Sequence, residues 1–488
     1  MVCDVMGMLS SSFIIQLSKI PKNCDMRFYE RVLLLHHKTR FMSRKILFAS
    51  LSILFFGLQT VIAQNSADTA KVEKTAKGKS LGTLTIGGYG EAVYKYNFFS
   101  DNVFRYSHAE NYANSKGHGR VDLPHAVIML GYDFGHGWSF NTETEFEHGG
   151  TESAVEVEAE ETGEFEKEIE RGGEVALEQF WLQKAFWGGK MNIRAGHMVV
   201  PVGGTNNAHL PTQFFGVYRP EGENTIIPCT WHETGIEVWG RIQDWRYDVM
   251  LIPSLNSSMF SVSGWAHDGS ASPYEFRVAN KLAVAARVDN YSVKGLHIGI
   301  SGFVGNTFRN DIITDEGSSR YANVRGTAVI GGLDFSYKTG GLIIRGSGLY
   351  GHLSDCELIS VYNSTLPHSS QAPYPQTLVG QAAWSAGGEI GYDVFHHHKN
   401  PKMDRHKLYL FARYEYYDSY IPGHNMTDYA WTDRQCVSGG INYSPIKEIV
   451  IKAEGGIRLL KSQYNQEPWC ALGITWAGMF SKEFHKRG

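Results

Sequence analysis

Strict alternation of apolar and polar residues is the feature that most restricts how this chain can fold. In "LYLFARYEYYDS", residues 408–419, every second residue is apolar or aromatic: Leu408, Leu410, Ala412, Tyr414 and Tyr416. The other set of alternate residues places Arg413 and Glu415 in the middle of the segment. A period of two predicts a β-strand with one apolar face and one polar face.

The same pattern recurs along most of the chain, separated by connections that alternate between short and long. Sixteen strands are predicted, near 83–96, 122–134, 138–147, 175–186, 191–199, 233–242, 245–253, 281–288, 296–305, 326–337, 342–351, 385–395, 407–417, 436–445, 449–459 and 468–480. Short turns on one rim and long loops on the other are typical of barrels that cross a bilayer. The pattern therefore predicts an all-β protein, a transmembrane antiparallel up-and-down β-barrel of about 16 strands over residues 83–480, with short periplasmic turns and long extracellular loops.

The segment before the barrel reads as an export signal. A basic "MSRK" precedes the apolar run "ILFASLSILFFGLQTVIA", which ends at Ala63. A basic start, an apolar middle and a small residue at the cleavage point predict a signal peptide over 42–63. Residues 1–41 are then expected to be a mis-called extension, 64–82 a short polar periplasmic leader, and 481–488 a C-terminal tail. The alternative, an uncleaved membrane helix, stays open.

Charge and cysteine content exclude several classes of partner and site. Removal of residues 1–63 takes eight basic residues from 46 and three acidic residues from 50, which leaves a net charge of −9. An acidic chain of this kind argues against a nucleic-acid partner. Four widely spaced cysteines remain, so neither a zinc motif nor a dense disulfide framework is indicated.

Charged residues on the polar faces of the predicted strands are expected to line the barrel interior. They are Glu91, Lys95, Glu143, Glu145, Glu147, Arg194, Glu237, Arg241, Arg287, Arg345, Glu389, Arg413, Glu415, Lys452, Glu454 and Arg458. A channel that selects anions such as phosphate needs a ladder of cationic side chains along its interior. This set mixes both signs, so the expectation is a general or weakly cation-preferring channel.

Three other polar segments were considered as binding sites. The acidic stretch 148–174 reads as a solvated outer loop, and its "EFEKEIER" part is compatible with a short, weak helix. "FHHHKNP" at 395–401 reads as a polar turn, because neighbouring residues of an extended chain point apart. His197, His209 and His232 bracket the segment 200–232, and polar packing is favoured there over a shared ligand. No catalytic constellation, cofactor or metal is predicted.

Five motifs in this order along the chain resemble the phosphate-selective porin O and P family, in its Bacteroidetes-type form. They are "TEFEHGG" (144–150), "LEQFWL" (177–182), "RAGHMVVPVG" (194–203), "RPEGENTIIPCTWHETGIEVWG" (219–240) and "FARYEYYDS" (411–419). The resemblance covers about 81–480. It implies a homotrimeric, water-filled channel whose third long loop, about 200–232, folds inward to narrow the pore.

The expected function is passive diffusion of small hydrophilic solutes or ions through the outer membrane of a Gram-negative bacterium. The final strand ends near Phe480, and an aromatic end of this kind is typical of proteins handed to the barrel-insertion machinery. The expected partners are therefore outer-membrane lipid, that machinery and the solutes. The alternative is an outer-membrane enzyme, adhesin or receptor that uses the barrel as a scaffold.

Overall fold

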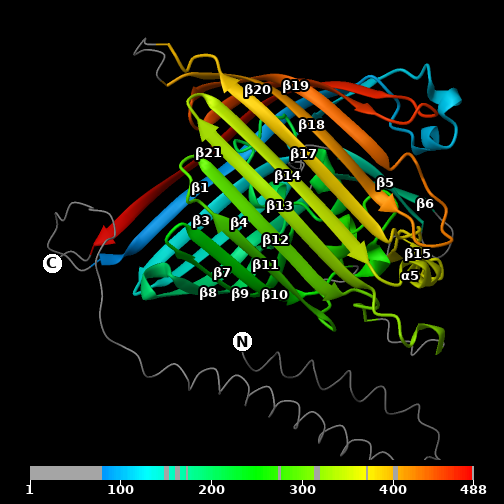
Figure 1. Ribbon diagram of the computed structural model, residues 1–488, viewed down its shortest axis with the longest axis horizontal. Coiled ribbons are helices and arrows are strands. Elements are labelled where there is room, and N and C mark those ends of the chain that lie inside the picture. The colour runs from blue at the N-terminus through cyan, green and yellow to red at the C-terminus, as the bar shows by residue number, and fades with distance from the viewer. Residues whose placement is uncertain are drawn as a thin grey trace, which may run out of the picture. The chain divides into compact units, whose positions relative to one another are not determined.

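The protein, seen here in a computed structural model, folds as a closed antiparallel β-barrel of sixteen strands (Figure 1). The structure describes residues 80–147, 153–159, 165–171, 174–272, 276–312, 319–369, 372–398 and 405–485. The barrel strands are β1 (Ser80–Asn97), β3 (His125–Gly135), β4 (Trp138–Glu147), β7 (Glu174–Phe186), β8 (Met191–Val199), β9 (His232–Ile242), β10 (Trp245–Pro253), β11 (Leu282–Asn290), β12 (Leu296–Asn306), β13 (Thr327–Thr339), β14 (Leu342–Leu353), β17 (Ala382–Asp393), β18 (Lys407–Ile421), β19 (Asp433–Ile446), β20 (Ile449–Leu459) and β21 (Glu467–His485).

The first and last strands close the barrel. β1 pairs with β21 from Gly82 opposite Phe484 to Asn97 opposite Trp469, and the blue and red strands lie side by side in Figure 1. Closure leaves no free edge along the sheet, so the backbone groups of every barrel strand find partners within the protein. The predicted fold class and all sixteen strands are confirmed.

Short additional elements lie in the connections between barrel strands. The strands are β2 (His118–Asp122), β5 (Ser153–Ala159), β6 (Phe165–Arg171), β15 (His368–Ser369) and β16 (Ala372–Pro373). The α-helices are α3 (Gly204–Asn207), α4 (Glu221–Ile226) and α5 (Cys356–Asn363). The 3-10 turns are η2 (Val103–Tyr106), η3 (Ala109–Tyr112), η5 (Trp187–Gly189), η6 (Ser257–Met259), η7 (His267–Ser270) and η8 (Ser319–Tyr321). No helix in the described part of the chain is long and apolar enough to cross a membrane.

Several predicted boundaries need correction. The second predicted strand, near 122–134, begins at His125 of β3, directly after Pro124, because proline cannot donate a hydrogen bond to the sheet; Asp122 ends the separate short strand β2. β21 runs to His485, so most of the expected tail continues the last strand. β1 begins at Ser80, three residues earlier than expected. The signal peptide and residues 1–79 lie outside the described residues.

The acidic loop contains a hairpin where a short helix was expected. β5 and β6 pair antiparallel, with Ser153 opposite Arg171 and Ala159 opposite Phe165. Val155 and Val157 alternate with glutamates in β5, which is the period of a strand and not of a helix. The helical interpretation of "EFEKEIER" is therefore wrong.

The outer face of the barrel is apolar. Along β18, Leu410 is 53 % exposed and Tyr414 is 48 % exposed, whereas Arg413 and Glu415 on either side of Tyr414 are buried. Exposed aromatic residues gather near the turn rim, at Phe134, Trp138, Trp245 and Tyr392, and near the loop rim, at Tyr94, Phe146, Tyr350 and Tyr414. An apolar belt between two aromatic girdles is the surface that a bilayer-spanning barrel presents to lipid.

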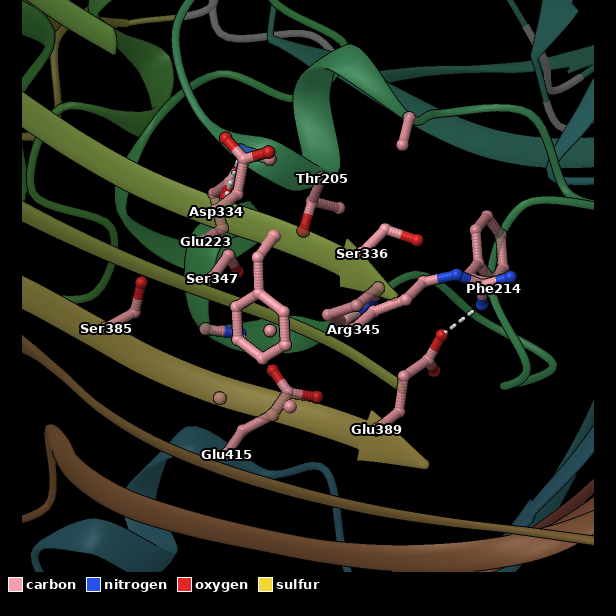
Figure 2. Close-up of a pocket in the computed structure, with 18 of the residues that line it drawn as sticks. Thr205, Phe214, Glu223, Asp334, Ser336, Arg345, Ser347, Ser385, Glu389 and Glu415 are labelled. Carbon is pink, nitrogen blue, oxygen red and sulfur yellow. Dashed lines mark hydrogen bonds and ion pairs between the residues drawn. The ribbon is translucent and has the colours of Figure 1, made fainter. Parts of the chain in front are cut away.

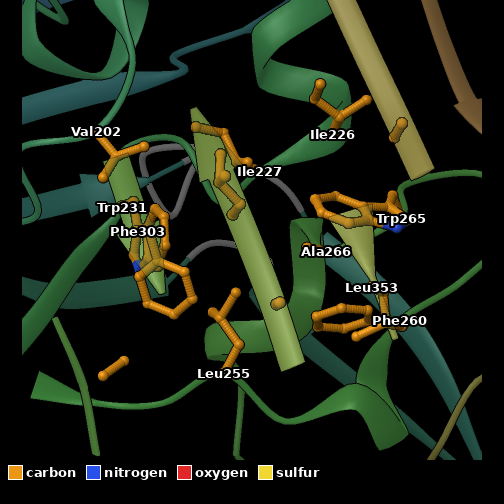
Figure 3. Packing of buried hydrophobic residues seen from close by; sticks show 14 of the residues in the cluster. Val202, Ile226, Ile227, Trp231, Leu255, Phe260, Trp265, Ala266, Phe303 and Leu353 are labelled. Carbon is orange, nitrogen blue, oxygen red and sulfur yellow. The ribbon is translucent and has the colours of Figure 1, made fainter. Parts of the chain in front are cut away.

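An apolar core fills part of the barrel interior near the loop rim. It brings together residues from the wall and from four long connections, including Trp231, Phe260, Trp265 and Phe303 (Figure 3). Gly351 of β14 permits this packing, because a Cβ there would lie 2.1 Å from the Trp265 ring. The interior of this barrel is therefore partly packed with apolar side chains.

Candidate functional site

The connection between β8 and β9, residues 200–231, lies inside the barrel; we call it the constriction loop. Its Gly203 N–H donates to Ser301 Oγ of β12 (3.0 Å), and its Val217 N–H donates to the Glu454 carboxylate of β20 (2.7 Å). The loop thus starts at one part of the wall and is held by another part far from it in the sheet. The expectation that this loop folds inward is confirmed, with its end at residue 231.

Lys452 of β20 is the most heavily used anchor of the constriction loop. Its side chain is 1 % exposed, and its ammonium donates to the carbonyl oxygens of Pro211 (2.6 Å), Phe214 (3.2 Å) and Gly216 (2.8 Å). Three acceptors satisfy all three donors of a lysine. A buried lysine in the middle of a strand therefore fixes six consecutive residues of loop backbone.

Arg413 and its carboxylate neighbours hold the next part of the loop. The guanidinium donates to Glu389 (3.0 Å) and to the carbonyl oxygen of Tyr218 (3.3 Å). Gly216 passes so close that a Cβ there would lie 2.5 Å from the guanidinium nitrogens. Glu415 accepts a hydrogen bond from the Gly222 N–H (2.7 Å). Both side chains brace the wall and the loop.

A chain of ion pairs connects α4 with β20, β21 and η2. Arg458 of β20 binds both carboxylate oxygens of Glu221 (2.6 and 2.7 Å) and one oxygen of Glu467 (2.8 Å). Arg105 of η2 also contacts Glu467. Burial alone would raise the pKa of the Glu221 carboxyl, but the Arg458 charge and hydrogen bonds outweigh it and bring the pKa to about 2. Glu221 is therefore ionised throughout the neutral range.

Arg287 holds the start of the constriction loop. It pairs with Asp289 (2.7 Å) on its own strand, β11, and with Asp334 (2.8 Å) on β13, two strands away. It also donates to the Gly203 carbonyl oxygen (3.3 Å). On β14, Arg345 pairs with Glu389 (2.5 Å). Cations of the wall are thus matched by carboxylates, and their fields cancel over short distances.

Strands β7 to β10 carry a second set of paired charges. Arg194 pairs with Glu237 (3.2 Å) and stacks over the Trp181 ring at 4.3 Å. Arg246, which the sequence analysis did not select, pairs with Asp248 (2.8 Å). Arg241 is exposed and lies over the Tyr291 ring at 4.6 Å, near the turn rim.

The remaining predicted residues lie on β1 and β4. Lys95 sits over the rings of Trp469 (4.7 Å) and Tyr218 (5.3 Å). His125 bridges Glu145 (2.5 Å) and Glu91 (3.9 Å). Glu143 is 3 % exposed and accepts from the Asn141 amide (3.1 Å). Glu147 ends β4, and its side chain lies outside what the structure describes.

The three bracketing histidines divide into two groups. His197 Nε2 and His232 Nδ1 are 2.5 Å apart, so these two contact each other. His209 of the constriction loop lies apart from them, with Nε2 at 3.6 Å from the Glu178 carboxylate of β7. Glu178 was missed because the β4–β7 register shifts beside it. The signal was present in the sequence: outward apolar residues fall at 175 and 177, then at 180 and 182, which marks a bulge.

A cavity separates the constriction loop from the wall. It measures about 150 Å³ and lies between Thr205, Phe214 and Glu223 of the loop and β13, β14, β17 and β18 of the wall (Figure 2). A neighbouring cavity of about 610 Å³ shares His297, Ser336 and Arg345 with it and extends toward the turn rim. A third, of about 220 Å³, is lined by Lys338, Arg345, Arg405, Lys407, Lys447 and Lys452. The opening of the barrel at the rim with the short turns, the turn-side mouth, is therefore basic.

Comparison with known proteins finds one similar sequence and many similar folds. No family model matches the chain. A protein of Aquifex aeolicus (strain VF5) described as uncharacterized is 25 % identical over 418 residues, which cover 83 % of this chain and 81 % of that protein.

Solved structures that resemble this fold include porins and an outer membrane channel. The anion-selective porin from Comamonas acidovorans has a TM-score of 0.46 at 9 % identity and covers 81 % of this chain and 100 % of its own. The outer membrane channel DcaP of Acinetobacter baumannii has a TM-score of 0.45 at 13 % identity, covering 82 % and 99 %. The Salmonella typhi OmpF complex with daunomycin has a TM-score of 0.44 at 9 % identity, covering 80 % and 97 %. The fold assignment itself rests on the strand pairing given above.

Proposed function

We propose that this protein is an outer-membrane porin, a passive channel for small hydrophilic solutes and ions, whose bore is set by the constriction loop. The observation that carries the proposal is the buried set of charged wall residues, with Lys452, Arg413 and Arg458 at its centre, that holds the loop inside a closed barrel with an apolar exterior. A loop that only covered the rim would need no such set of anchors within the barrel. A narrowed bore limits the size of solute that passes.

We further propose weak ion selectivity for this channel. The wall cations Arg194, Arg287, Arg345, Arg413 and Arg458 each pair with a carboxylate. Pairing of this kind leaves little net field in the narrow part. The acidic loop 148–174 on the outer rim supports a slight preference for cations, and the basic turn-side mouth opposes it.

The ordered motifs support membership of the phosphate-selective porin O and P family, and we propose a homotrimer on that ground alone. The family name does not extend to the solute, because the paired charges do not form a continuous cationic ladder.

The selectivity proposal is tested by reversal potentials in asymmetric KCl across planar bilayers. We expect a small potential of the sign that marks K⁺ preference. A strong preference for chloride would contradict it.

Liposome swelling with sugars of increasing mass tests the constricted pore. We expect a sharp upper limit on the mass of the sugars that enter. Barrels that admit no solute would favour a scaffold for an enzyme or adhesin instead.

A further inference from the structure

Three potential metal ligands meet where the constriction loop touches the β4–β7 wall. Glu143 lies on β4, Glu178 on β7, and His209 on the loop two residues after α3. One ligand atom from each lies within 4.8 Å of the other two, and these residues are the one such group found in the described part of the chain. The wall and the loop therefore contribute to a single cluster.

The hydrogen bonds of His209 leave its second ring nitrogen without a proton to share. Nδ1 lies 3.2 Å from the Asn206 carbonyl oxygen, and a carbonyl oxygen can only accept, so Nδ1 carries the proton. In the neutral ring, Nε2 then presents a lone pair. This lone pair faces Glu178 Oε1 at 3.6 Å, which is too long for a hydrogen bond. Two electron-rich atoms facing each other call for a cation between them.

The carboxylates supply a second, independent observation. Glu178 is fully buried and Glu143 is 3 % exposed. Glu178 Oε1 and Glu143 Oε2 have no hydrogen-bond partner within the protein. A buried carboxylate oxygen without a partner costs about 1–3 kcal/mol or more. A bound cation would satisfy both oxygens at once.

Neighbouring groups orient the ligands. Tyr89 is fully buried, and its hydroxyl donates to Glu178 Oε2 (2.8 Å), which turns the other oxygen toward His209. The Asn206 side chain bonds to Val200 O (2.8 Å) and Trp231 N (2.6 Å), so the carbonyl that fixes His209 is itself held. Outer partners of this kind set ring orientation and carboxylate direction in metal sites.

Carboxylates outnumber cations around the cluster. Glu145 of β4 and Glu91 of β1 lie nearby, and His125 contacts both. Arg219 interacts with Glu178 and Glu145, Lys452 with Glu91, and Arg194 with Glu143, but Arg194 is itself paired with Glu237.

We propose that Glu143, Glu178 and His209 form a binding site for a divalent transition metal, with Zn²⁺ as the best match. One imidazole and two carboxylates are ordinary Zn²⁺ ligands, whereas Ca²⁺ and Mg²⁺ take oxygen ligands. Zinc lies about 2.0–2.2 Å from such ligands, so the three side chains close in by about 1 Å on binding. The ion would link the constriction loop to the β4–β7 wall, two residues before the Pro211 carbonyl that Lys452 binds.

The test is Zn²⁺ binding by the untagged mature protein in detergent, after EDTA treatment, followed by isothermal titration and metal analysis. His396, His397 and His398 follow β17 and could bind zinc on their own, so all proteins carry glutamine at these three positions. We expect one Zn²⁺ per protomer. Glu178→Gln and His209→Gln should each weaken binding by about 100-fold or more, and Tyr89→Phe by roughly tenfold.

His297→Gln is the matched control, because His297 is another interior histidine beside a carboxylate, Asp289 at 2.8 Å; its Zn²⁺ affinity should equal that of the parent. Heat-dependent gel mobility confirms that each barrel is folded. If Glu178→Gln does not fold, His209→Gln decides the question. A parent that binds no zinc, or that binds no better than His209→Gln, overturns the proposal. The measurement needs no ion flow, so its failure and that of the proposed channel are distinguishable.

Discussion

Individual charged residues on the barrel wall hold the constriction loop in place through hydrogen bonds to its backbone. Arg413 and Glu415 look misplaced in an apolar strand, yet each binds loop backbone directly. Their burial is possible because Arg413 has an opposite charge in Glu389 and Glu415 accepts a hydrogen bond from the loop backbone. Arg413 and Glu415 are thus structural anchors of the constriction loop.

Replacement of Lys452 by methionine should loosen the constriction loop. The variant leaves three loop carbonyls without their donor, at a cost of about 1–3 kcal/mol for each buried group. We expect a lower temperature for the heat-induced gel shift and a noisier, larger single-channel current. Lys294→Met, at an exposed position in the turn between β11 and β12 that lines none of the cavities described above, is the control and should change neither. Equal behaviour of the two variants would remove the anchoring role of Lys452.

Glu221→Gln should lower barrel stability in a pH-dependent way. Its pKa is about 2 in the folded protein, below the ordinary carboxyl value of 4.5. The pair with Arg458 therefore contributes fully above pH 4.5 and is lost as pH falls toward 2. Loss of one partner of a buried pair costs about 3 kcal/mol. The melting difference between parent and variant should be constant from pH 7 to pH 5 and should shrink below pH 4; a difference that grows on acidification would contradict the assignment.

Among the elements, the strands could be predicted from the sequence, but the packing of loops and side chains inside the barrel could not. Period-two alternation identifies β18 or β20 without help, since one face meets lipid and the other does not. The same alternation does not indicate whether the Arg413 side chain faces water or the backbone of a loop inside the barrel. Contacts such as Lys452 with Pro211 join residues 241 positions apart, and no local pattern records them.

The apolar core illustrates the same limit. Ala283, Ala285, Met250 and Ile252 lie on inner faces, where alternation alone predicts polar residues. They pack against Trp231 and Trp265, which lie in long connections. These residues are therefore apolar because they are buried inside the barrel, and not because they face lipid. The bulge at Glu178 was likewise overlooked, and with it one ligand of the proposed zinc site.

Gly351→Leu should disrupt this core. A side chain at Gly351 would meet the Trp265 ring at 2.1 Å, whereas a Cβ at Gly331 of the adjacent strand meets nothing within 4 Å. We expect a loss of about 1–3 kcal/mol of stability for Gly351→Leu and almost none for Gly331→Leu. Melting of both variants by heat-dependent gel mobility provides the comparison, and equal losses would argue against close packing at Trp265.

At the scale of the whole molecule, the barrel combines an apolar exterior, a loop held across its interior and a basic mouth on the turn side. These features together support a channel that limits solutes by size more than by charge. The apolar core and the constriction loop both reduce the open interior, so the bore should be far narrower than sixteen strands alone would give.

Single-channel conductance in planar bilayers tests this account most directly, with the parent protein compared with a variant in which residues 208–219 are replaced by a short Gly-Ser linker. We expect discrete ohmic steps from both and a clearly larger step from the variant, because the loop anchored by Lys452 and Arg413 no longer narrows the bore. Folded parent barrels that give no steps would contradict a channel function, and equal steps from the two proteins would contradict a pore narrowed by the constriction loop.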